Sequence, residues 1–129
     1  MPRNTLGISY RPALAEAEVM PADAVFADLS KIIADRKATP SDDSYTCKLL
    51  SGGVAKIAGK ITEEAAEVIE AAAEPGEEGR QHLIREAADL VYHLLVMLAA
   101  RDADASDVAV ELARRFGVSG LEEKRSRGE

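Results

Sequence analysis

The stretch ITEEAAEVIE, residues Ile61–Glu70, predicts the fold because its apolar and charged residues repeat at the spacing of an α-helix. The same spacing continues on both sides and ends at the segment EPGEEG, residues 74–79, whose proline and glycines stop a helix. We therefore predict a helix from residue 54 to about residue 73. Its expected core face consists of Val54, Ile57, Ile61, Ala65, Val68 and Ala72.

The glutamates of this helix point to different sides of it. An α-helix turns by about 100° per residue, so each position can be placed around the axis. Lys60, Glu64 and Glu67 form a stripe that flanks the expected core face. Glu63 and Glu70 lie near the opposite pole. Glu64 and Glu67 are therefore expected to face a neighbouring helix, and Glu70 is expected in solvent.

A second segment, REAADLVYHLL at residues 85–95, also carries carboxylates among small and apolar residues. Spacings of four, three and four place four residues on one stripe of a helix that runs from about residue 78 to residue 100. The four are His82, Glu86, Asp89 and His93. An unpaired carboxylate at the edge of a buried surface is costly, so Asp89 must be paired, protonated or bound to a metal.

The end of the same helix, from Leu90 to Ala100, is apolar on nearly every side, which is typical of a helix that is buried all round. Four or five short helices in one small chain cannot bury it fully. We therefore expect a homodimer in which helices of both subunits complete the core.

The residues alone leave three interpretations of the carboxylates open. They can form a solvated helix face, or Arg85 and Arg101 can neutralise Glu86 and Asp89. Alternatively, an ExxE on one helix that faces an ExxD on the next provides four oxygen donors, which suit Mg²⁺ or Mn²⁺. The two histidines are expected in the core or at the surface rather than as ligands, because their spacing also suits hydrogen bonds to carboxylates.

The segments before residue 54 predict further helices. Helical spacing begins at Asp23 and ends by Pro40. The segment SDDSYTCKLLSGG, residues 41–53, predicts a short helix that its glycine pair stops, and this pair is wrongly spaced for a phosphate-binding loop. Because no window of useful length alternates with period two, we predict an all-α chain.

The two ends of the chain differ in pattern. Residues 1–22 contain three prolines and no sustained periodicity, so we expect a flexible extension. After the long helix, Asp104 or Ser106 can cap a helix that reaches Phe116. A last short helix is expected from Ser119.

Composition and charge limit the function. A chain of 129 residues with net charge −7 forms one domain, and it lacks the basic surface needed to bind nucleic acid or an anionic membrane. The single cysteine, Cys47, excludes an internal disulfide and a multi-cysteine zinc site. With no apolar stretch that reaches about 18 residues and no signal-peptide pattern, we expect a cytoplasmic protein.

Two motifs carry a resemblance to a known family. EEAAE at residues 63–67, followed after eighteen residues by EAAD at residues 86–89, resembles the EExxE…ExxD signature of the MazG-like all-α nucleoside triphosphate pyrophosphohydrolases. The blocks SYTCKLLSGG, KITEEAAEVIEAA, EAADLVYHLLVML and ELARRFGVSGLEEKRSR are similar, in unbroken order, to the phosphoribosyl-ATP pyrophosphatase family. We therefore expect residues 23–129 to form a MazG-like bundle of four to five helices. Thr62 departs from this pattern, because relatives often have glycine there.

The resemblance implies a reaction and a set of site residues. It implies hydrolysis of phosphoribosyl-ATP between its α and β phosphates, which yields phosphoribosyl-AMP and pyrophosphate with Mg²⁺ in the second step of histidine biosynthesis. Carried over by position, the metal ligands would be Glu64, Glu67, Glu86 and Asp89. Glu63 would add a metal contact or activate the attacking water, so the expected catalytic residues are Glu63, Glu64 and Glu67.

Basic residues near the motifs are expected to bind the phosphates. Lys60 lies one turn before Glu64 on the same stripe, so its ammonium group should reach the site. The other expected phosphate ligands are Lys48, Lys56, Arg115, Lys124 and Arg125. Two further functions stay open. The first is a house-cleaning pyrophosphohydrolase that acts on ordinary or damaged nucleoside triphosphates, and the second is a non-catalytic helical dimer.

Overall fold

Helices make up nearly all of the chain that the computed structural model describes, which comprises residues 22–117 and 128. The described part contains no strand, so the all-α prediction is confirmed. Its elements are η1 (Ala22–Ala24), α2 (Val25–Ala38), α3 (Tyr45–Ala72), α4 (Gly76–Ala100) and α5 (Ala105–Phe116). The predicted N-terminal extension up to residue 21 and the helix expected from Ser119 lie outside the described residues.

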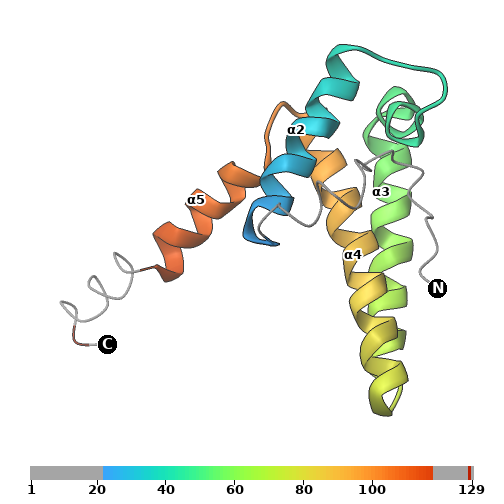
Figure 1. Cartoon of the computed structure of the whole chain (residues 1–129), viewed down its shortest axis with the longest axis vertical. Helices are drawn as coiled ribbons and strands as arrows, with labels where there is room; N and C mark the ends of the chain where they lie inside the picture. Colours follow the sequence, from blue (N-terminus) through green and yellow to red (C-terminus); the bar gives the residue numbers. More distant parts are fainter. Residues whose placement is uncertain (1–21, 118–127, 129) are drawn as a thin grey trace.

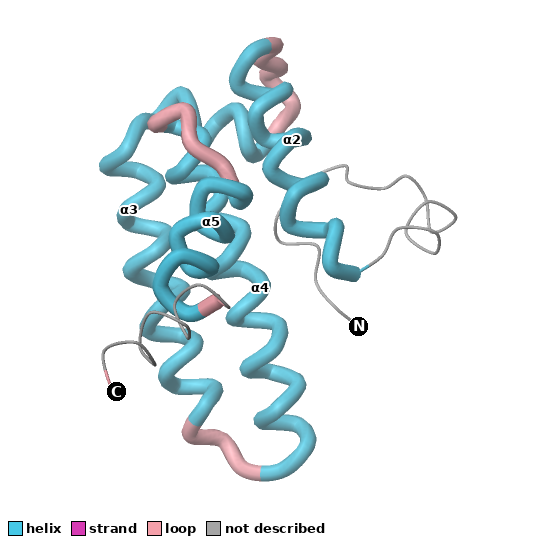
Figure 2. The backbone as a smooth tube through the Cα atoms, turned by 90° about the vertical axis from the view of Figure 1, so that its left-hand side faces the viewer, coloured by secondary structure: helices cyan, strands magenta, loops and turns pink. Residues whose placement is uncertain are grey.

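Helices α3 and α4 form a long antiparallel hairpin, which is the main body of the structure (Figure 1). The hairpin closes at Ala73–Pro75, where the fixed backbone of proline precedes the first turn of α4. Helix α2 packs at the open end against both long helices, and α5 leads away from the hairpin and contacts α2 (Figures 1 and 2). None of the described helices has the length and apolar character that a membrane span requires.

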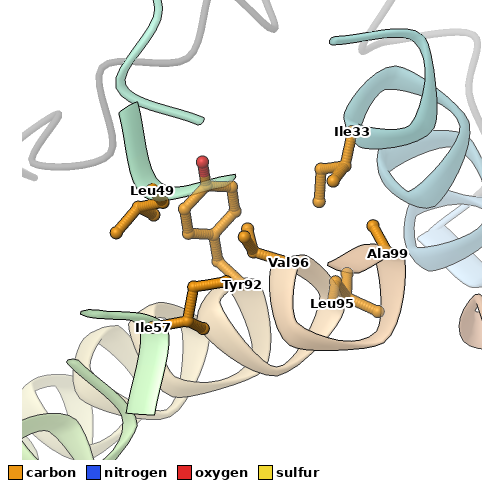
Figure 3. Close-up of a cluster of buried hydrophobic side chains, with 7 residues drawn as sticks. All are labelled: Ile33, Leu49, Ile57, Tyr92, Leu95, Val96 and Ala99. Carbon is orange, nitrogen blue, oxygen red and sulfur yellow. The ribbon is translucent and has the colours of Figure 1, made fainter. Parts of the chain in front are cut away.

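The aliphatic core lies at the open end of the hairpin, where α2, α3 and α4 meet (Figure 3). Tyr92 is the largest side chain in it, and its hydroxyl bonds to that of Thr46, which satisfies both buried polar groups. Tyr92 therefore serves packing. The buried cluster consists of Ile33, Leu49, Ile57, Tyr92, Leu95, Val96 and Ala99.

Polar contacts fix the C-terminal end of α4. The Lys37 ammonium donates to the carbonyl of Ala99 at 2.9 Å and to Asp102 Oδ1 at 2.7 Å. A cation in this place adds a hydrogen bond to a carbonyl of the last helical turn and opposes the negative end of the helix dipole. Asp104 then caps α5 in a capping box with Asp107, which confirms the predicted start of that helix.

The predicted core face of α3 is confirmed only in part. Ile57 is buried and Ile61, Ala65 and Val68 are half-buried, but Val54 (50% exposed) and Ala72 are exposed. Glu64 and Ala71 are buried in their place, so the buried face is turned toward the stripe of Glu64. The difference arises because α4 packs on the stripe of Glu64, which the sequence pattern placed beside the core. A pattern of apolar residues alone does not reveal a buried carboxylate.

The predicted break at Gly52-Gly53 is present as a kink inside α3 rather than as a gap between two helices. Gly53 has φ +82° and ψ −178°, a backbone conformation that is nearly restricted to glycine. The kink lets the first two turns of α3 place Leu49 in the core at an angle different from that of the remaining helix.

This kink predicts opposite effects of alanine at two glycines of the same helix. At both Gly53 and Gly59 an added Cβ meets no atom within 4 Å, so only the backbone conformation differs. We expect Gly53→Ala to lower the free energy of unfolding by about 1–2 kcal/mol, and Gly59→Ala to raise it by about 0.5–1 kcal/mol. Urea denaturation of the two variants measures this, and equal signs would contradict the assigned strain.

Candidate metal centre

Three carboxylates converge where α3 and α4 pack together. One oxygen from each of Glu64, Glu67 and Glu86 lies within 4.8 Å of the others. Glu64 and Glu86 are only 8% and 6% exposed, and Glu67 is half-buried. The two helices of the hairpin therefore bring together ligands that are about twenty residues apart, as the paired motifs predicted.

Two oxygens of this cluster are buried without a partner. Glu64 Oε2 and Glu86 Oε2 have no hydrogen bond to any group in the described part of the chain. Burial, together with the charges of Asp89, Glu67 and Glu86, raises the pKa of Glu64 from 4.5 to about 7. A divalent cation resolves both problems, and closely spaced hard oxygens suit Mg²⁺ or Mn²⁺. The residues present thus fit such an ion.

Asp89 lies one turn after Glu86 on α4 and borders the cluster. After burial, its charge is the largest influence on the pKa of Glu64, which places its carboxylate near that residue. Its oxygens do not belong to the group that lies within 4.8 Å. Its role as a fourth ligand stays a prediction from the motif.

Glu63 lies outside the cluster and is exposed, as its angle on the helix predicted. Its carboxylate is 3.7 Å from the Lys60 ammonium group. Burial raises the pKa of Tyr45 and lowers that of His93, and the half-buried Lys60 adds a positive charge that favours a lower pKa at both residues, which border the carboxylates. The structure thus brings one predicted phosphate ligand close to the candidate site.

Tyr45 and His93 form a polar contact next to the site. No spacing in the sequence indicated this contact. His93 Nδ1 lies 2.8 Å from the Asp89 carbonyl, and this oxygen can only accept, so Nδ1 donates. Burial lowers the pKa of His93, which keeps the ring neutral and leaves Nε2 to accept from the Tyr45 hydroxyl at 3.0 Å. Both ring nitrogens are therefore occupied, which confirms that His93 is a core residue.

His82 is the basic partner of Glu86. Its Nε2 lies 3.2 Å from Glu86 Oε1, and its Nδ1 lies 3.0 Å from both oxygens of Glu74. The i, i+4 spacing indicated a hydrogen bond of this kind between His82 and Glu86, and Arg85 and Arg101 were the alternative partners; no pattern indicated Glu74 as the second partner of His82. Glu74 precedes His82 by eight residues across a Pro-Gly turn, a separation that has no regular helical signal.

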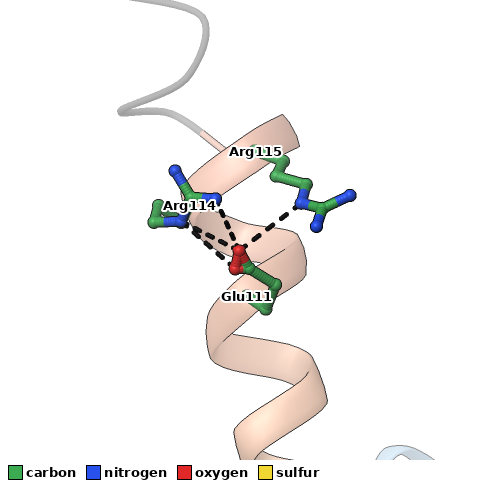
Figure 4. A network of polar contacts seen from close by, with 3 residues as sticks. All are labelled: Glu111, Arg114 and Arg115. Atoms are coloured by element: carbon green, nitrogen blue, oxygen red, sulfur yellow. Dashed lines mark hydrogen bonds and ion pairs between the residues drawn. The ribbon is translucent and has the colours of Figure 1, made fainter.

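The other predicted phosphate ligands that the structure describes have no contact with the three carboxylates. Lys48 and Lys56 are exposed on the N-terminal part of α3, and the side chain of Lys56 lies against Gly52. On α5, Arg115 and Arg114 both bind Glu111 (Figure 4). Lys124 and Arg125 lie outside the described residues.

The fold and the site define a class of protein. An all-α hairpin whose antiparallel helices hold facing ExxE and ExxD motifs is typical of MazG-like pyrophosphohydrolases. The family model described as phosphoribosyl-ATP pyrophosphohydrolase matches residues 26–116. The chain belongs to this family and is a hydrolase.

Curated relatives agree with this family. A protein of Rhodopirellula baltica is 54% identical over 99 residues, which cover 77% of this chain and 82% of the relative. A protein of Dinoroseobacter shibae is 50% identical over 103 residues, which cover 80% of this chain and 98% of the relative. Both relatives are named phosphoribosyl-ATP pyrophosphatase.

The raised pKa of Glu64 predicts that the metal-free chain loses stability as the pH rises. Between pH 4.5 and about 7 the folded chain keeps a proton that the unfolded chain releases. The resulting stabilisation is fully present below this range and lost above it, and it amounts to as much as about 3 kcal/mol.

Thermal unfolding from pH 4.5 to 8 without divalent metal measures this effect. Glu64→Gln should flatten the pH profile, whereas the exposed Glu70→Gln, on the same helix, should keep it. Identical profiles of the two variants would show that Glu64 does not hold the proton.

Proposed function

We propose that the chain hydrolyses phosphoribosyl-ATP between its α and β phosphates, giving phosphoribosyl-AMP and pyrophosphate in histidine biosynthesis. The supporting observation is the buried cluster of Glu64, Glu67 and Glu86 in a chain whose curated relatives carry the name of this activity. A cytoplasmic location stays a prediction from composition.

We further propose that the reaction depends on Mg²⁺, with Mn²⁺ as a substitute. Glu64, Glu67 and Glu86 would hold the ion, and Asp89 would complete the set. When bound, the metal supplies positive charge to the phosphate oxygens and makes a water molecule more acidic. Without it, a negative cluster repels a negative substrate, so metal-free protein should bind the substrate poorly.

The groups around the cluster have roles that follow from their charge. Lys60 offers a cation beside the carboxylates, so it is placed to contact a phosphate oxygen. Glu63 pairs with Lys60 from the exposed side and is the acceptor available for a proton from water there. Tyr45 and His93 are hydrogen-bonded to each other, and His93 is also bonded to the backbone of Asp89, so these contacts restrain the backbone that carries the Asp89 carboxylate.

Variants of the cluster test this function. Glu64→Gln and Asp89→Asn keep size but remove charge, so each should reduce pyrophosphate release about 100-fold or more and weaken Mg²⁺ binding. Glu70→Gln, an exposed change on α3, should leave both unchanged. Calorimetric titration with Mg²⁺ and a phosphate assay with added pyrophosphatase provide the measurements. Unchanged values in the first two variants would refute the metal site.

A comparison of substrates tests the specificity in the same assay. Phosphoribosyl-ATP should be turned over far faster than ATP or dUTP. Equal rates would instead indicate a house-cleaning pyrophosphohydrolase that shares the metal site and lacks a selective pocket.

We propose a homodimer as the active form. On α5, Val108, Leu112 and Phe116 recur at a spacing of four and are all exposed. Of the described elements, α2 is the one that packs against this helix. Leu94 on α4 is also exposed, so one chain does not bury α4 on every side. A second copy would cover these apolar side chains, since exposed apolar patches favour association.

A charge on the apolar face of α5 should disrupt this dimer. Leu112→Glu is expected to shift the sedimentation coefficient to that of a monomer, because it would place a carboxylate in an apolar interface. Val110→Glu is the matched control, because Val110 is 70% exposed and lies roughly 160° from the centre of that face. A monomeric parent chain, or equal behaviour of both variants, would contradict the assignment.

A further inference from the structure

His82 connects the end of α3 to a buried carboxylate of the candidate metal centre. Its ring lies between Glu74, at the hairpin turn, and Glu86, on the same face of α4 one turn later. Each ring nitrogen faces a carboxylate oxygen, within 3.0 Å on one side and 3.2 Å on the other. Both rotation and tilt of the ring are therefore restrained.

The two oxygens of Glu86 have different surroundings because of this contact. Oε1 accepts from His82, whereas Oε2 is buried without a hydrogen-bond partner in the described part of the chain. A carboxylate has one terminal rotation, so a bond to Oε1 also fixes the direction of Oε2. Glu86 thus keeps one oxygen available for the convergent group that it forms with Glu64 and Glu67.

A contribution to folding stability does not explain why His82 lies between Glu74 and Glu86. The side chains of His82 and Glu74 are 34% and 47% exposed, and an ion pair this exposed contributes only about 0–1 kcal/mol. The ring also borders an open recess of about 420 Å³, so it fills no apolar core. The contact of His82 instead orients Glu86. In metal sites, hydrogen bonds from residues that do not touch the metal commonly orient its ligands in this way.

We propose that His82 is a positioning residue of the metal centre: it holds Oε1 of Glu86 so that Oε2 stays directed at Glu64 and Glu67, while Glu74 fixes the imidazole ring. The inference rests on the proposed metal-dependent function. It assigns to Glu74 and His82, neither of which belongs to the paired acidic motifs, an effect on metal affinity.

Titration of the full-length chain with Mn²⁺, followed by electron paramagnetic resonance and without substrate, tests this inference. We expect His82→Ala to raise the Kd for Mn²⁺ about 10- to 100-fold and to broaden the spectrum of the bound ion. His82→Gln should stay within about threefold of the parent, because a glutamine amide can donate to Glu86 from the same position. Glu74→Ala, which frees the ring but leaves it in place, should have an intermediate effect.

Gln81→Ala is the matched control. Gln81 precedes His82, lines the same recess and bonds to Glu77 rather than to Glu86. The Kd of the Gln81→Ala variant for Mn²⁺ should therefore equal that of the parent chain. A parent chain that binds no Mn²⁺ would overturn the proposed metal centre itself. If the parent binds and His82→Ala binds equally well, the positioning role is refuted and the metal centre stands. If His82→Gln is as weak as His82→Ala, the hydrogen bond is not the cause.

Discussion

The structure depends on one electrostatic constraint, which is that carboxylates from two neighbouring helices are packed against each other. Like charges at this separation, removed from water, favour neutralisation of at least one group. Among the described residues, no lysine or arginine forms an ion pair with Glu64, Glu67 or Glu86; His82 contacts Glu86, and Lys60 pairs with the neighbouring Glu63. The divalent ion that we propose would satisfy all three carboxylates at once.

The aliphatic core makes this arrangement tolerable. Tyr92, Leu95 and Val96 pack at the open end of the hairpin, whereas the carboxylates lie nearer its closed end. The apolar contacts of α2 with the hairpin therefore hold α3 and α4 together at one end while charges oppose each other further along. The residues that stabilise the fold and the carboxylates of the site therefore lie on different turns of the same two helices.

Much of this could be predicted from periodicity. The helix bounds, the cap at Asp104, the break at Gly53 and the pairing of the two acidic motifs follow from local patterns, because these depend on spacing and on turn-forming residues. The buried face of α3 was predicted only in part: Ile57 is buried as expected, but Glu64, which the pattern placed beside the core, is buried while Val54 is exposed. The contacts of Tyr45 with His93 and of Glu74 with His82 join residues across helices or across a turn, where sequence spacing carries no signal.

The short turn at Ala73–Pro75 also affects how the site forms. The three ligands of the cluster belong to two helices joined by a few residues, so bringing them together closes only a small loop and costs little chain entropy. Contacts so local in sequence form early and quickly in folding. The carboxylates of the cluster can thus assemble within a single helical hairpin before α5 has docked, and the proposed ion, by binding there, would also stabilise the folded hairpin.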